Sequence, residues 1–118
     1  MEKLTYQEEE VLMIIYQLGK GFIKDILEQM EEPRPPYTTV ASIVKNIERK
    51  GYLSSKRYAN SYQYTPMINH EDYKSESMAR MVSVYFGNSY KKMVSFFAKE
   101  QKISIDELEE IIRLIEKK

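Results

Sequence analysis

The sequence contains no cysteine and no tryptophan, and the only histidine among its 118 residues is His70. The lack of cysteine excludes disulfides, a thiol nucleophile and thiolate metal ligands. His70 falls where we expect the first turn of a helix, a position more typical of a solvated side chain than of a catalytic one. The chain also lacks a glycine-rich phosphate loop and a nucleophile elbow. We therefore expect a protein that is not an enzyme and that needs no metal or cofactor.

Long apolar runs are missing as well. No stretch approaches the roughly 18 consecutive apolar residues of a membrane-spanning helix, and Met1–Thr5 does not begin a signal peptide. Hydrophobic residues make up 42% of the chain and charged residues 31%, a balance typical of a globular protein. We expect a soluble, cytoplasmic protein without membrane insertion.

The chain carries no net charge, yet its charges are unevenly placed. Residues 1–36 hold four Lys/Arg against eight Asp/Glu, whereas residues 37–64 hold five Lys/Arg against a single acid, Glu48. Overall neutrality gives no support for a nucleic-acid-binding protein. A local basic stripe, however, is the electrostatic footprint that such a protein carries. The middle of the chain is therefore the first place to look for a binding site.

Two helices are predicted ahead of this basic segment. The first spans residues 6–18, where a capping box of Thr5 and Glu8 begins the helix and Gly19 ends it. The second fits residues 22–30, whose apolar side chains recur at helical spacing.

A stiff connector and a third helix follow. Residues 31–36 contain three prolines, which fix φ and remove backbone donors, so this connector cannot be helical. The third helix follows Tyr37 and runs to about Lys50, with Gly51 as its stop and apolar residues at i, i+3, i+4 and i+7. The connector thus joins two short helices that are expected to pack together.

A β-hairpin is predicted directly after the third helix. Residues 52–57 read as a strand, residues 58–61 as a turn, and residues 62–65 as a return strand that ends at Pro66. Three helices followed at once by a hairpin is the order of a winged helix-turn-helix domain. In that fold the third helix lies in the major groove of DNA.

The rest of the chain is predicted to be helical, over residues 70–86, 89–100 and 105–117. We place a winged-helix DNA-binding domain at residues 1–68 and a helical dimerisation domain at residues 69–118. The expected fold class is mainly α with a small β-hairpin.

The polar face of the third helix carries short hydroxyls, an amide and cations, which suit contact with base edges and phosphates. The hairpin extends this basic surface and adds tyrosines. Two alternatives stay open: a merely solvated helix face, and a winged-helix module that docks a partner protein without sequence-specific DNA binding. The predicted DNA-contacting residues are Tyr37, Thr38, Thr39, Ser42, Lys45, Asn46, Arg49, Lys50, Lys56, Arg57, Tyr58, Asn60 and Ser61.

The C-terminal helices carry more apolar side chains than they can bury against themselves, and leftover apolar surface marks an interaction site. A core shared with the first domain is one interpretation. We prefer a homodimer interface, because readers of dyad operators need two copies related by a two-fold axis. The predicted interface residues are Met78, Met81, Val82, Tyr85, Phe86, Tyr90, Met93, Val94, Phe97, Leu108, Ile111, Ile112 and Ile115.

Six short segments together form a family pattern. They are Leu4–Thr5, Glu8–Glu10, Leu18–Gly19, Pro36–Val40, Lys50–Leu53 and Tyr62–Pro66. Combined, they resemble the penicillinase repressor family, also called the BlaI/MecI/CopY family. The resemblance covers nearly the whole chain and is sharpest over residues 4–68.

The resemblance implies a dimeric transcriptional repressor of double-stranded DNA operators, often with TACA-type half-sites, upstream of resistance or stress genes. It places Arg57–Ser61 on the DNA backbone. The base-facing positions that it implies are Thr38, Thr39, Ser42, Lys45 and Asn46.

The resemblance also implies a means of release. In the antibiotic-sensing branch, a membrane-bound sensor metalloprotease triggers cleavage of the repressor at an Asn-Phe bond. The matching bond here is Ser95–Phe96, where Ser replaces Asn. The copper-sensing branch uses C-terminal cysteines, and their lack in this chain excludes copper sensing through thiolates.

Overall fold

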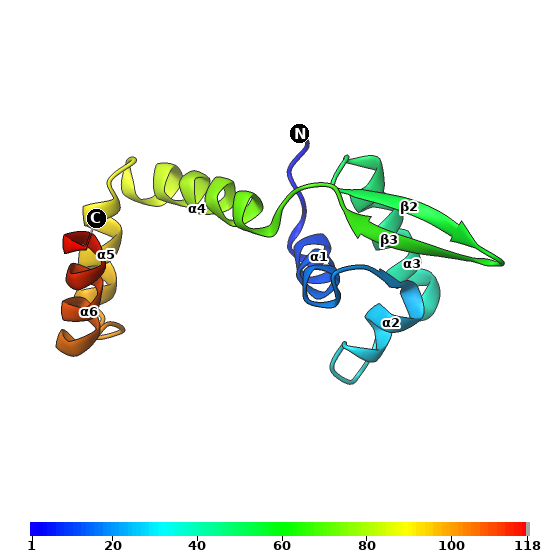
Figure 1. Cartoon of the computed structure of the whole chain (residues 1–118), viewed down its shortest axis with the longest axis horizontal. Coiled ribbons are helices and arrows are strands. Elements are labelled where there is room, and N and C mark those ends of the chain that lie inside the picture. Colours follow the sequence, from blue (N-terminus) through cyan, green and yellow to red (C-terminus); the bar gives the residue numbers. More distant parts are fainter. Residues whose placement is uncertain (118) are drawn as a thin grey trace. The chain divides into compact units, whose positions relative to one another are not determined.

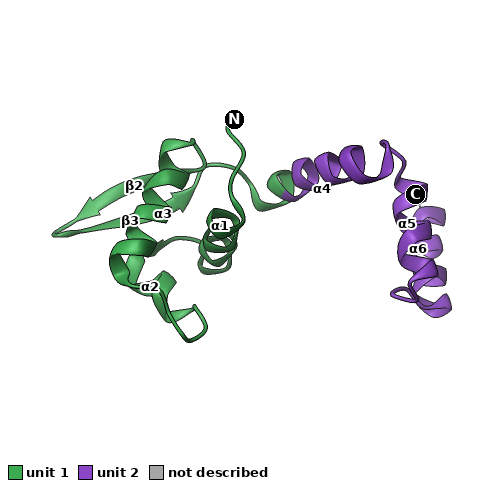
Figure 2. Cartoon of the chain, turned by 180° about the vertical axis from the view of Figure 1, so that it is seen from behind, with its two compact units in different colours: residues 1–73 green, residues 74–118 purple. Residues whose placement is uncertain are grey.

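The computed structural model describes residues 1–117, and it is mainly helical with a small antiparallel sheet (Figure 1). Lys118, the last residue of the predicted C-terminal domain, lies outside the described residues. Contacts divide the chain into two compact units, residues 1–73 and 74–118 (Figure 2). This division falls inside helix α4 (His70–Phe86), whereas the domain boundary predicted from the sequence precedes that helix.

The helices of the first unit are α1 (Tyr6–Leu18), α2 (Ile23–Glu28) and α3 (Tyr37–Arg49). The capping box that begins α1 is confirmed: the Thr5 hydroxyl accepts from the Glu8 amide at 3.2 Å, and the Glu8 carboxylate accepts from the Thr5 amide at 2.8 Å. Both groups satisfy donors that a helix start leaves without partners.

Helix α2 is shorter than the predicted span of residues 22–30. Its first predicted residue, Phe22, is extended and donates its amide to the Asp25 carboxylate at 2.9 Å, which begins the helix one residue later. At the other end, the Gln29 amide turns back to the carbonyl of Ile26, so the helix closes with a tight final turn.

The sheet has three strands rather than the predicted two. Strand β1 (Gly21–Phe22) pairs with β3 (Ser61–Pro66), which pairs in turn with β2 (Leu53–Tyr58), giving the order β1-β3-β2. The β2–β3 hairpin, called the wing below, turns over only two residues, with Ala59 at φ 52°. Strand β1 escaped prediction because two residues carry no alternating pattern.

The core of the first unit lies where α1 and α2 pack against α3 and the sheet. Six of its aliphatic side chains are completely shielded from solvent, and burial of each contributes about 1.5–3 kcal/mol relative to exposure. They are Leu12, Ile15, Ile26, Val40, Val44 and Ile47.

The first turn of α4 belongs to the first unit because aromatic side chains attach it to α1. The rings of Tyr16 and His70 stack with centroids 4.3 Å apart, and the Tyr16 hydroxyl donates to the carbonyl of Ile68 at 2.7 Å. The buried Tyr73 donates its hydroxyl to the Glu9 carboxylate. His70 is therefore half-buried in a stack, and the expectation of a solvated side chain is wrong.

The second unit continues α4 and adds α5 (Tyr90–Lys99) and α6 (Ile105–Glu116). The predicted break after α4 is confirmed, since Gly87 and Asn88 both adopt positive φ, at 56° and 65°. Ser89, predicted as the first residue of its helix, instead caps α5, which begins at Tyr90. A capping box of Ser104 and Glu107 begins α6 at Ile105, where the sequence pattern predicts that helix to start. Within residues 1–117, no helix has the length and apolar character needed to span a membrane.

Candidate nucleic-acid interface

Helix α3 has one buried face and one exposed polar face. Val40, Val44 and Ile47 are fully shielded from solvent and fix the rotation of the helix. The side chains predicted to read DNA therefore lie outward on the other face. Seven of them are exposed: Tyr37, Thr38, Thr39, Ser42, Lys45, Asn46 and Arg49.

The two cations of this face differ in their surroundings. Lys45 has no ion-pair partner within residues 1–117, so its ammonium is available to a ligand. Arg49 lies 3.6 Å from the Glu2 carboxylate, and both side chains are more than half exposed. Such surface pairs contribute little, about 0–1 kcal/mol, so this contact does not prevent Arg49 from binding a phosphate.

Lys50 does not extend the basic surface, contrary to the prediction. Its side chain is only 7% exposed, and its Nζ lies 2.6 Å from the Glu8 carboxylate. Burial by itself raises the pKa of the Glu8 carboxyl, but the hydrogen bonds from Lys50 and from the Thr5 amide outweigh it and hold the pKa below its ordinary value. Lys50 is a structural cation that ties the end of α3 to the start of α1.

The first residues of the chain reinforce this tie. The Lys50 ammonium also donates to the carbonyl of Lys3 at 3.2 Å, and the Tyr52 hydroxyl donates to the carbonyl of Glu2 at 2.8 Å. We call these contacts, together with the Arg49–Glu2 pair, the N-terminal clamp. The clamp holds the end of α3 and the first residues beyond it against the N-terminus.

The wing presents the second group of predicted residues, and Lys56, Arg57, Tyr58, Asn60 and Ser61 are all exposed. They are not independent of one another. The Lys56 ammonium lies 5.4 Å from the centroid of the Tyr58 ring, which is a cation–π distance. The Arg57 guanidinium donates to the carbonyl of Ala59 at 3.0 Å, so this side chain folds back over the turn.

Phe22 of β1 supports the wing and was not predicted as part of the site. Its ring meets the Tyr58 ring edge to face, with centroids 5.9 Å apart. The contact joins the wing to the residue that precedes α2. No sequence signal indicated it, because it depends on the pairing of β1 with β3.

Glu48, the single acid of residues 37–64, already accepts a hydrogen bond within the protein. The half-buried Glu48 carboxylate accepts a hydrogen bond from the Ser55 hydroxyl of β2. Nearby, burial raises the pKa of the Tyr64 hydroxyl, with a further contribution from Glu48, so Tyr64 is a neutral core residue. The exposed surface of α3 and the wing therefore offers hydroxyls, an amide and cations to an anionic polymer.

The predicted interface residues of the second unit separate into three groups. Seven are exposed, namely Met78, Tyr85, Tyr90, Val94, Ile111, Ile112 and Ile115. Five are half-buried, namely Met81, Phe86, Met93, Phe97 and Leu108. Val82 is only 1% exposed, so it is already buried within the protomer and cannot meet a partner. Val84 and Leu114, which the predicted interface does not include, are also exposed, at 75% and 68%.

The Ser95–Phe96 bond lies in the middle of α5. Ser95 is half-buried and Phe96 is 48% exposed. The carbonyl of Phe96 accepts a hydrogen bond from the Glu100 amide, so the bond is part of a hydrogen-bonded helix rather than an extended segment. A protease that cleaves here must first unwind α5.

The three helices, the β2–β3 wing and the exposed polar face of α3 define a winged-helix DNA-binding regulator. The chain belongs to the penicillinase repressor family, whose profile matches residues 4–117. It is accordingly a DNA-binding transcriptional repressor and not an enzyme.

Relatives of known role agree with this assignment. The chain is 24% identical over 124 residues to the methicillin resistance regulatory protein MecI of Staphylococcus aureus (strain N315), and 23% identical over 123 residues to MecI of Mammaliicoccus sciuri. Both alignments cover 100% of each chain.

A solved structure shares the fold. The regulator BpsR of Bordetella bronchiseptica, studied for the regulation of its DNA binding by 6-hydroxynicotinic acid, matches with a TM-score of 0.50 and 15% identity. The match covers 98% of this chain and 75% of BpsR.

Proposed function

We propose that this repressor binds as a homodimer to an operator with two-fold symmetry. Each protomer places the exposed face of α3 in the major groove and lays its wing along the adjacent backbone. The observation that carries the proposal is the outward face of α3, which combines Thr39, Ser42 and Lys45 without an acid and lies opposite a fully buried stripe. Short hydroxyls allow close approach to base edges, and Lys45 supplies charge.

The proposal of a homodimer rests on the apolar side chains that α6 leaves exposed. Ile112 is 51% exposed and Ile115 is 69% exposed, although both belong to an apolar stripe of an amphipathic helix. A second copy of the same stripe would cover them, and two-fold association matches the symmetry of a dyad site.

We further propose TACA-type half-sites and control of a resistance gene. The support is the family resemblance, together with relatives that are named as methicillin resistance regulatory proteins. A sensor metalloprotease that brings about cleavage at Ser95–Phe96 is the matching means of release. Co-expression with such a sensor is expected to yield a fragment that ends at Ser95, detected by intact mass. Cleavage elsewhere would contradict this assignment.

Fluorescence anisotropy tests the DNA-binding proposal most directly. A labelled duplex with two TACA-type half-sites is compared with a single half-site and with a scrambled duplex, over a series of salt concentrations. We expect tight binding to the dyad. The logarithm of the binding constant should fall by about 0.9 per logarithmic unit of salt concentration for each phosphate contact. Equal, weak binding to all three duplexes would favour the alternative of a protein-docking module. A different operator would be excluded if selection from random duplexes then enriched no sequence.

A further inference from the structure

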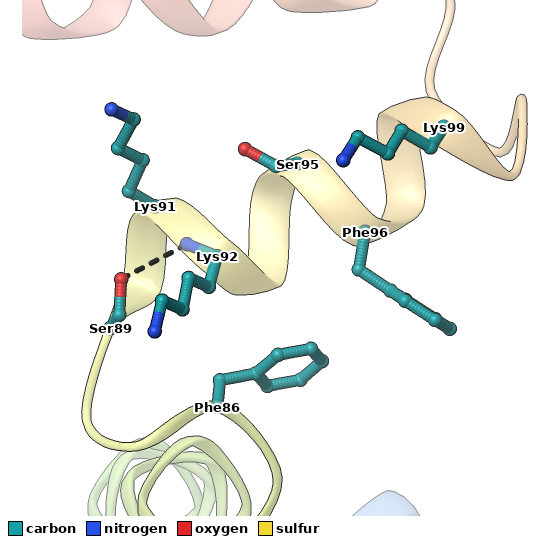
Figure 3. A pocket seen from close by; sticks show the side chains of 7 residues that line it. All are labelled: Phe86, Ser89, Lys91, Lys92, Ser95, Phe96 and Lys99. Atoms are coloured by element: carbon teal, nitrogen blue, oxygen red, sulfur yellow. Dashed lines mark hydrogen bonds between the residues drawn. The ribbon is translucent and has the colours of Figure 1, made fainter.

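The second unit contains a cavity to which no ligand has been assigned above, although Phe86 of its lining also belongs to the predicted dimer interface and Phe96 to the predicted cleavage bond. It has a volume of about 500 Å³ and lies between the end of α4 and one face of α5 (Figure 3). Two phenylalanines, two serines and three lysines line it. This volume falls within the range of small-molecule sites, about 300–1,000 Å³.

The apolar part of the cavity is a pair of aromatic rings. Phe86, from the end of α4, and Phe96, from α5, lie with ring centroids 5.7 Å apart and planes tilted by 57° (Figure 3). The Phe97 ring also meets the Phe96 ring edge to face, with centroids 5.5 Å apart. Because Phe96 is 48% exposed, the pair leaves room for a third ring.

The polar part of the cavity is uniformly basic. Lys91, Lys92 and Lys99 lie on one face of α5, and no carboxylate lines the cavity. None of these lysines forms an ion pair within residues 1–117. The Ser89 hydroxyl accepts a hydrogen bond from the amide of Lys92 at 3.1 Å, so the lysine ammoniums and the Ser95 hydroxyl are the groups left to bind a ligand.

We propose that this cavity binds a small aromatic anion of the aryl carboxylate class. The ring packs on Phe86 and Phe96, and the carboxylate accepts charge-assisted hydrogen bonds from Lys92 and Lys99. A neutral apolar ligand would leave the lysines unused, and an inorganic anion would leave the two rings uncovered. The proposal concerns the second unit and does not depend on the operator, but it requires that the proposed homodimer leave the cavity open, because Phe86 also belongs to the predicted interface.

Salicylate is the probe of choice. Because the chain has no tryptophan, salicylate fluorescence can be followed at wavelengths where the protein contributes little. Titration with the full-length protein is expected to give saturable binding that benzoate displaces and inorganic phosphate does not. Lys92→Gln removes one charge-assisted hydrogen bond and should weaken binding about tenfold.

Matched variants separate this site from general attraction to a basic surface. Phe96→Leu should also weaken binding, because it removes the aromatic contact. Lys102→Gln removes an exposed lysine of the same unit that does not line the cavity, and it should leave binding unchanged. Circular dichroism checks that each variant keeps its helices.

Three results would overturn the proposal. The first is the lack of saturable salicylate binding. The second is binding that phosphate displaces as well as benzoate does, or that Lys102→Gln weakens as much as Lys92→Gln does. The third is binding that appears only in the dimer-breaking variant Ile112→Asp, which would mean that a second copy covers the cavity with its acid-rich α6.

Discussion

Lys45, within α3, and Lys50, the residue that caps its end, are the same residue type, yet they have opposite environments. Lys45 is exposed without an ion-pair partner within residues 1–117, whereas Lys50 is buried against Glu8. The sequence could predict that the face around Lys45 is outward, because the apolar stripe fixes the helix rotation. It could not predict the Lys50–Glu8 pair, because the two residues lie 42 positions apart and meet only in the folded chain.

Alanine at each lysine separates the two roles. Lys45→Ala should weaken operator binding by about 1–3 kcal/mol while changing the free energy of unfolding by less than about 0.5 kcal/mol. Lys50→Ala should lower the free energy of unfolding by about 3–5 kcal/mol, because it leaves the buried Glu8 carboxylate without its cation. Urea unfolding and fluorescence anisotropy measure the two quantities. Equal effects of both variants on stability would contradict this division.

The Glu8 carboxyl also makes stability depend on pH. Its pKa in the folded chain lies below the ordinary value of 4.5, so folding favours the ionised form. The contribution is fully present above pH 4.5 and is lost as the pH falls through the lower pKa of the folded chain. Urea unfolding of Glu8→Gln should therefore show a smaller loss of stability below pH 4.5 than the unchanged chain does. Parallel curves for the two proteins would remove Glu8 from this role.

At the scale of elements, boundaries were predictable where a side chain caps a helix. Thr5 and Ser104 each cap a helix with a hydroxyl that accepts a hydrogen bond from a backbone amide, and both helix starts agree with the sequence pattern. Helix α2 and strand β1 were not predictable in detail. Phe22 follows helical spacing in the sequence, but pairing with Gln63 of β3 holds it extended. Tertiary pairing here outweighs local preference.

The wing offers a test at this scale. Tyr58 contacts both the Phe22 ring and the Lys56 ammonium, so it holds the wing and its cation in place. Tyr58→Ala should weaken operator binding by about 1 kcal/mol, the size of one aromatic or cation–π contact. Tyr58→Phe keeps the ring and serves as the control. If the phenylalanine variant loses as much affinity as the alanine variant, the hydroxyl rather than the ring makes the contact.

At the scale of the whole molecule, the sequence predicted two domains. The predicted boundary between them differs from the boundary between the two compact units of the structure. The predicted boundary follows residue 68, shortly before the helix predicted from residue 70. The first turn of α4 nevertheless packs with the first unit, through the Tyr16–His70 stack and the buried Tyr73. The burial of Val82 within its own protomer could not be predicted either. An apolar side chain on an amphipathic helix gives the same sequence pattern whether its own chain or a partner chain covers it.

Association of two copies is tested by charge on the exposed stripe of α6. Ile112→Asp places a carboxylate where we propose that an apolar partner surface packs, and Ile112 is exposed enough for the protomer to tolerate it. We expect monomers by sedimentation, with affinity for a dyad reduced to that for a single half-site. Glu109→Gln, on the same helix, should remain dimeric. A dimeric Ile112→Asp protein would place the interface elsewhere.

The N-terminal clamp has a practical consequence for anyone who prepares this protein. Glu2 and Lys3 precede residue 4, where the family match begins, yet their carbonyls accept hydrogen bonds from Tyr52 and Lys50, just beyond the end of α3. Truncation of these first residues, or a fusion partner attached to them, would therefore remove contacts that hold the end of α3, which we propose to bind the operator. DNA affinities measured on such a preparation would describe a protein in which the end of α3 is no longer held by the N-terminal clamp. A purification tag is therefore better placed at the C-terminus.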